Sequence, residues 1–325
     1  MSDGPGRWRS FAIIFGVAAA YALALRLLFA AQPLEGWLQI VSIAFVWTVP
    51  ISSGALICYL GNRFDRPRLF WAAGAPPLTM LVLMIGAVAV KLEALMCAVV
   101  SAPVVIPASI FGGMAMHFIL LYFSDRGRMM VNLFVLLPLA MSPLEQVWKE
   151  PHEQRVMHDS VLIHADAKTI WRHIYEVPAI QREELPEQWI YLLGFPRPIA
   201  ATIDRQGVGG RRHATFERDV SFFEVVTNWE PEKKLSFTIK ADPDFIPHTA
   251  FDQHVIVGGR FYNVLDGAYE IEPKSDGSCV LHLSSTHRLS TRFNWYTGWW
   301  SEWVMAQVQG SILEVIRKRC ERRSV

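Results

Sequence analysis

The side chains best suited to chemistry in this sequence lie in one strand-like segment, residues 279–289. Alternate residues of a β-strand point to the same face of a sheet. In this segment, one face would carry Leu281, Leu283, Ser285, His287 and Leu289. We therefore expect Ser285 and His287 to point into an apolar interior, where a hydroxyl and an imidazole can hold a ligand or move a proton.

Other aromatic residues are expected to line the same interior. Tyr269 alternates in step with Ile271, and aromatic residues also occur at the start of the last helical segment. A mostly aromatic cavity with a few converging polar groups is typical of a ligand site. The predicted ligand-binding residues are Trp189, Tyr269, Ser285, His287, Tyr296, Trp300 and Trp303. The alternative is a filled core in which Ser285 and His287 bond to each other or to the backbone.

Catalysis is the second interpretation of these residues. If the protein is an enzyme, His287 or Tyr269 would serve as the acid or base. The sequence shows no carboxylate partner for His287, so we favour ligand contact and predict no catalytic residue.

The sequence contains no convincing metal-binding or phosphate-binding motif. His152, Glu153 and His158 lack the i, i+4 spacing that lets two imidazoles reach one zinc ion on a helix. The glycines at 207, 209 and 210 lie between strands, without the lysine and helix start of a phosphate-binding loop. We therefore predict no metal and no cofactor.

The charge pattern gives no reason to expect nucleic acid as a partner. The formal net charge is +1, and no basic stretch is interleaved with aromatic residues. Arg211, His213 and Glu217 share one strand face, which we interpret as solvated.

The elements that position these residues form an antiparallel meander followed by a long helix. Strands are predicted at residues 156–163, 199–205, 211–218, 221–229, 235–240, 261–272 and 279–289, with helices at 166–174, 185–193 and 296–321. In the last helix, Val304, Val308, Ile312 and Val315 or Ile316 form one stripe that must be buried. Gly310 within it indicates either a close approach by a neighbouring backbone or a weak spot.

This order of elements resembles the START-like superfamily, also called SRPBCC, of polyketide cyclases, dehydrases and lipid-transport domains. The residues that prompt the resemblance are SVLIHADAKTIW at 160–171, GVGGR at 207–211, VTNWEPEKKLSF at 226–237 and ILEVIRKR at 312–319. The resemblance covers the C-terminal half alone. It implies an α+β helix-grip domain, in which a curved antiparallel sheet wraps the C-terminal helix and holds an apolar ligand against it.

The N-terminal half is apolar enough for a membrane. Of the whole chain, 52% of residues are hydrophobic and 19% charged, and nearly all of the excess lies before residue 142. Four apolar segments, at about 11–31, 36–60, 69–90 and 94–123, approach or exceed the roughly 20 residues that cross a bilayer. A fifth segment, 129–147, would span only with Glu145 at the interface. Whether it spans decides which side holds the C-terminal half.

Arg26 and Glu93 are charged residues within or beside these apolar segments. We expect Arg26 to snorkel or to pair with Glu93 or Glu35, in preference to forming an ion or substrate path.

We therefore predict a multi-pass transmembrane helical domain at 1–148, a linker at 149–155 and a START-like domain at 156–325. The predicted protein is an integral membrane protein of a bacterial inner membrane that binds a lipid or other hydrophobic small molecule near the bilayer. The alternatives are a membrane-bound cyclase-like, dehydrase-like or hydrolytic enzyme and a non-catalytic protein-interaction module. Protein partners and oligomeric state are left open.

Overall fold

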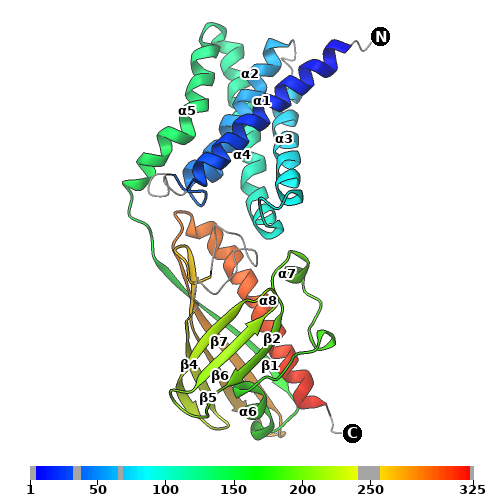
Figure 1. The fold of residues 1–325 in the computed structure, drawn as a ribbon, viewed down its shortest axis with the longest axis vertical. Helices are drawn as coiled ribbons and strands as arrows, with labels where there is room; N and C mark the ends of the chain where they lie inside the picture. The colour runs from blue at the N-terminus through cyan, green and yellow to red at the C-terminus, as the bar shows by residue number, and fades with distance from the viewer. Residues whose placement is uncertain (1–4, 32–37, 65–68, 241–256, 323–325) are drawn as a thin grey trace. The chain divides into compact units, whose positions relative to one another are not determined.

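The computed structural model describes residues 5–31, 38–64, 69–240 and 257–322 (Figure 1). The chain divides into two compact units, residues 1–149 and 150–325. We call them the helical unit and the sheet unit. Each has its own hydrophobic clusters.

The helical unit contains five helices that are long and apolar enough to cross a membrane. They are α1 (Pro5–Phe29), a π-helical turn η2 (Ala44–Thr48) continued by α2 (Val49–Arg63), α3 (Leu69–Ala89), α4 (Leu95–Tyr122) and α5 (Gly127–Gln146). The fifth apolar segment therefore forms a full-length helix, although two prolines lie within it. That these helices span a bilayer is still a prediction.

Two acidic residues connect segments of the helical unit. Arg26 forms an ion pair with Glu93, one of the two partners expected for it. Glu35, the other, lies outside the described residues. The side chain of Glu145 is buried against other residues of the helical unit, and its expected place at a membrane interface is still a prediction. Its carboxyl oxygens accept hydrogen bonds from the backbone N–H groups of Ile43 and Ala44, each at 2.9 Å, and so satisfy donors at the start of η2.

The sheet unit begins with β1 (Glu153–Ile163), followed by α6 (Ala167–Tyr175), the 3₁₀ turn η4 (Arg182–Glu184) and the short α7 (Trp189–Leu192). The strands β2 (Pro198–Ile203), β3 (Arg211–Phe216), β4 (Ser221–Glu230), β5 (Lys234–Lys240), β6 (Tyr262–Pro273) and β7 (Cys279–Leu289) follow. The long helix α8 (Asn294–Glu321) ends the unit. All seven predicted strands are confirmed, whereas the expected helix at 185–193 is only four residues long.

The seven strands form one antiparallel sheet in the order β1-β7-β6-β5-β4-β3-β2. The first strand pairs with the last, with Glu153 opposite Leu289 and Ile163 opposite Cys279. The sheet curls around α8 (Figure 1), which is the helix-grip arrangement implied by the sequence resemblance.

The inner face of the sheet is covered differently by the two halves of α8. In the C-terminal half, Leu313, Val315 and Ile316 are buried, and Leu313 and Ile316 belong to the main core. In the N-terminal half, Val304 and Val308 are only partly buried. Of the expected stripe, Val315 and Ile316 are buried, whereas Val304, Val308 and Ile312 are only partly buried. The first half carries apolar side chains that the described residues leave partly uncovered.

Candidate functional site

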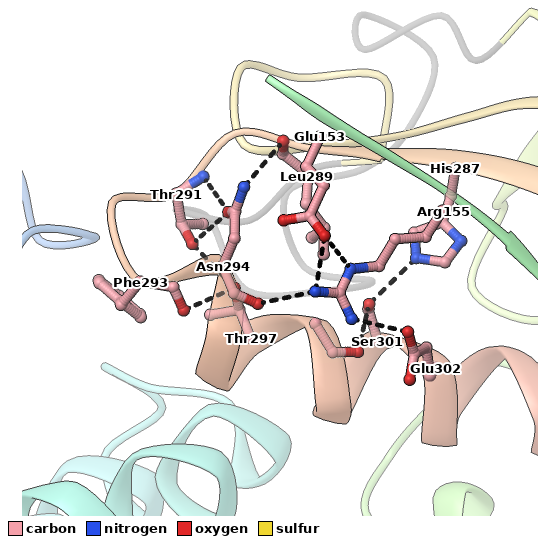
Figure 2. A network of polar contacts seen from close by, with 11 residues as sticks. Glu153, Arg155, His287, Leu289, Thr291, Phe293, Asn294, Thr297, Ser301 and Glu302 are labelled. Atoms are coloured by element: carbon pink, nitrogen blue, oxygen red, sulfur yellow. Dashed lines mark hydrogen bonds and ion pairs between the residues drawn. The ribbon is translucent and has the colours of Figure 1, made fainter. Parts of the chain in front are cut away.

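His287 is the centre of the candidate site. Its side chain is fully buried on the inner face of β7. Its Nε2 atom lies 3.1 Å from Ser301 Oγ of α8, and Ser301 Oγ in turn donates to the carbonyl of Gly298 at 2.9 Å (Figure 2). Because the serine hydroxyl has one proton, His287 donates through Nε2. The Nδ1 atom is then an acceptor, and it has no hydrogen-bond partner among the described residues.

Burial and the nearby Arg155 keep His287 neutral, against the smaller opposing effect of Glu302 and Glu153. Arg155 lies directly opposite it on β1 and binds Glu302 at 2.6 Å and Glu153 at 2.9 Å (Figure 2). Burial lowers the pKa of the His287 imidazole below its usual 6.5, and the positive charge of Arg155 acts in the same direction. At neutral pH, His287 therefore presents an uncharged acceptor.

The turn from β7 into α8 is held by polar side chains. The Asn294 side-chain oxygen accepts hydrogen bonds from the N–H and hydroxyl of Thr291, at 2.8 and 2.9 Å (Figure 2). Thr291 also contacts the hydroxyl of Thr297 at 2.8 Å. These bonds satisfy groups at the start of α8 and so fix where Ser301 lies relative to His287.

A second polar pair lies further along the same strand. Gln309 of α8 donates through Nε2 to Ser285 Oγ at 2.8 Å, and both side chains are buried. Gln309 Oε1 has no partner in the described part of the chain. The filled-core alternative supposed that Ser285 and His287 bond to each other or to the backbone. They do not bond to each other. Each bonds to a side chain of α8.

The inner face also holds an ion pair that the sequence interpretation missed. Arg212 of β3 lies opposite Glu224 of β4, and the two form an ion pair with side chains 4% and 8% exposed. Burial raises the pKa of the Glu224 carboxyl, and the charge of Arg212 opposes that shift. Burial also raises the pKa of the Tyr269 hydroxyl, and the nearby charge of Arg212 opposes that shift. The Arg212 guanidinium lies over the Phe237 ring, 5.4 Å from its centroid.

The predicted site residues are not all brought together. Ser285 and His287 face α8, and Tyr269 lies with Arg212. Trp300 and Trp303 are partly buried with ring centroids 5.9 Å apart, and Tyr296 is also partly buried. Trp189 is 71% exposed and does not lie in the interior, because α7 buries Ile190 and Tyr191 instead. Whether these residues bind a ligand is still a prediction.

The inward position of Arg212 could have been predicted from the sequence. Of the face expected to be solvated, Arg211 is exposed, whereas His213 and Glu217 are partly buried. Strand alternation then places Arg212 on the opposite, inner face, where it is found. Gln309 and Ser301 are polar residues of α8. They were missed because only the apolar residues of this helix were considered.

No protein-family model matches this sequence, and no curated protein matches it. Solved structures resemble about half of the chain. Truncated norcoclaurine synthase from Thalictrum flavum is 15% identical with a TM-score of 0.35, over 55% of this chain and 99% of that one. An uncharacterized protein from Rhizobium leguminosarum is 12% identical with a TM-score of 0.36, over 54% of this chain and 100% of that one.

Proposed function

We propose that the sheet unit binds an apolar small molecule between its curled sheet and the first half of α8. The observation that carries this proposal is the Nδ1 atom of His287, a fully buried acceptor without a partner in the described residues. Leaving such a group unsatisfied costs about 1–3 kcal/mol. A ligand hydroxyl or N–H group would offset that cost.

The surroundings of His287 favour an apolar ligand body. The first half of α8 offers Trp300, Trp303, Val304 and Val308, all partly buried. Apolar surface that is shielded from water only in part gains free energy when a ligand covers it, at about 25 cal/mol per Å².

The helical unit would serve as a membrane anchor. Only residues 147–152 join α5 to β1, so the sheet unit is tethered by a short segment to helices apolar enough to enter a bilayer. We propose that the ligand is a lipid or another hydrophobic molecule drawn from that bilayer.

Extraction of bound molecules from the full-length protein tests this function. Wild type, His287→Phe and the control His282→Phe are purified in mild detergent, extracted with solvent and compared by mass spectrometry. His282 lies on the same strand, with its side chain 44% exposed. All three proteins carry the same helical unit and hence the same bulk lipid. A molecule present with wild type and His282→Phe but lost from His287→Phe supports the proposal. Identical extracts would contradict it.

Hydrolysis is a second candidate, because Ser301 Oγ lies 3.1 Å from His287 Nε2, a distance that suits a nucleophile and its base. It requires the other imidazole tautomer, in which Nε2 accepts the serine proton. The arrangement lacks a carboxylate on His287 Nδ1 within the described residues, and Arg155 lowers the basicity of the imidazole. Ester hydrolysis by the wild type that disappears in Ser301→Ala, with ligand binding retained, would favour the hydrolase. Because His287 has neither a carboxylate partner in the described residues nor a raised basicity, we favour ligand binding over hydrolysis.

A further inference from the structure

The ion pair of Arg212 and Glu224 faces the same interior as His287 but plays no part in the site described around it. The two groups are connected across the inner face of the sheet. Arg212 lies over Phe237. Phe237 in turn lies over Gly267, where a Cβ atom would be 2.8 Å from the ring. Gly267 is the direct neighbour of Ser285 on β7. A continuous row of buried, contacting residues on the inner surface of the sheet therefore links Arg212 to the Ser285 and Gln309 pair.

The hydrogen-bonding groups left unpaired on this surface differ between its two sides. On the β3 side, Arg212 Nε is a buried donor without a partner in the described residues. On the α8 side, His287 Nδ1 and Gln309 Oε1 are buried acceptors without partners there, and Trp300 Nε1 is a buried donor of α8 without a partner in the described residues. A ligand that matches the surface has an acceptor at one end and a donor at the other.

The charges decide which acceptor fits. Glu224 already compensates the guanidinium charge of Arg212. A carboxylate or phosphate bound at Arg212 Nε would therefore bring an uncompensated negative charge into a buried site, which is strongly unfavourable. A carbonyl oxygen accepts the same hydrogen bond without adding charge.

We propose, resting on the proposed function above, that the ligand is an uncharged apolar molecule with a carbonyl group and a hydroxyl group at opposite ends. Arg212 Nε donates to the carbonyl, and the hydroxyl donates to His287 Nδ1 or Gln309 Oε1. Four strand spacings of about 4.8 Å separate β3 from β7, so the two ends lie about 19 Å apart measured across the strands of the sheet.

Binding of three matched probes to the full-length protein in detergent tests the inference. The probes are a radiolabelled long-chain ω-hydroxy methyl ketone, the alcohol of the same length without the carbonyl, and the ω-hydroxy carboxylic acid. Scintillation proximity measures Kd for each. We expect wild type to bind the hydroxy ketone about tenfold or more tightly than either other probe, the effect of one hydrogen bond to a charged donor.

We expect one variant to reverse this preference and a second variant to remove it. In Glu224→Gln the charge of Arg212 is no longer compensated, so the hydroxy acid gains tenfold or more and becomes the preferred probe. In the double variant Arg212→Gln/Glu224→Gln the three probes bind alike. Circular dichroism verifies that each variant is folded.

Several outcomes would overturn the inference. Equal binding of all three probes to wild type, or preference for the acid, shows that Arg212 does not select a neutral carbonyl, while the binding function itself stands. A folded Glu224→Gln variant that gains no affinity for the hydroxy acid would also show that Arg212 does not select the ligand. Binding of none of the probes also rejects this ligand class, and the His287→Phe extraction then decides separately whether the binding function fails too.

Discussion

The guanidinium group of Arg155 lies against the backbone of Gly298, so closely that a Cβ atom on Gly298 would be 2.2 Å from Arg155 Cζ. Arg155 is held in this position by Glu153 and Glu302 and by the carbonyl of Asn294 at 3.4 Å. The sequence suggested a neighbouring backbone close to Gly310, but the tight contact on α8 is made by the side chain of Arg155 at Gly298, near the start of the helix. At Gly310, only side-chain atoms of Asp159 and Gln188 come within 4 Å of the Cβ position, both at 3.6 Å.

We predict opposite effects of alanine at these two glycines. Gly298→Ala displaces Arg155 from its hydrogen bonds and lowers the free energy of unfolding by about 1 kcal/mol, even after the gain in helix propensity. Gly310→Ala meets ordinary contacts and raises it by up to about 1 kcal/mol. Pulse proteolysis of the sheet unit in urea measures both. Equal effects of the two substitutions would show that Arg155 moves aside freely.

His287→Phe is predicted to stabilise the ligand-free protein while abolishing ligand binding. The phenyl ring fills a similar volume and removes the unpaired Nδ1 acceptor, and Ser301 keeps its bond to Gly298. We expect a gain of about 1 kcal/mol in the free energy of unfolding of the delipidated protein, measured by urea titration. A loss of more than 1 kcal/mol would mean that the bond to Ser301 outweighs the unsatisfied acceptor.

The same histidine predicts a pH dependence of stability. In the folded protein, burial lowers the pKa of His287 below 6.5, whereas the unfolded chain takes up the proton near that value. The unfolded state then binds more protons, so the contribution of His287 is present above pH 6.5 and is lost as the pH falls toward the folded pKa. Wild type should lose at most about 1.4 kcal/mol per pH unit relative to His287→Phe.

Urea titrations at pH 7.5 and 5.5 measure this difference, and His282→Phe serves as the control on the same strand. His173 also has its pKa lowered by burial, but it is present in all three proteins and cancels. Parallel stability curves for wild type and His287→Phe would show that His287 takes up protons as readily in the folded protein as in the unfolded chain.

Glu145→Ala is predicted to destabilise the helical unit by about 2 kcal/mol or more. The substitution leaves the N–H groups of Ile43 and Ala44 without the acceptors they have now, at a cost of about 1–3 kcal/mol for each buried donor. Thermal unfolding in detergent is the measurement, with the neighbouring Gln146→Ala as control. If the two variants unfold at the same temperature, water or detergent replaces the lost acceptor.

The strands were predictable from local alternation because one face of each strand is buried. Leu235 and Phe237, expected on the dry face of β5, are 0% and 4% exposed. Leu281, Leu283, Ser285, His287 and Leu289 of β7 are likewise all buried, as predicted. The periodicity of a strand follows from its backbone geometry, so it can be recognised without knowledge of the partner strand.

The polar contacts were not predictable in the same way, because they depend on register and on packing between elements. Arg212 and Glu224 meet only because β3 and β4 pair with these two residues opposite each other. Glu145 is buried only because the start of η2 lies beside α5. Trp189 was misplaced because its sequence neighbours do not show which side of the single turn α7 packs inward; Ile190 and Tyr191 are the residues buried there.

The pairing of the first strand with the last sets the order of events during synthesis. While the ribosome is still translating the middle of the sheet unit, β1 has no partner, because β7 is not yet made. The apolar helices precede it in the chain and leave the ribosome first. The sheet unit therefore closes late, after the apolar helices have been made, and until then β1 is an unpaired strand whose pairing with other chains must be prevented.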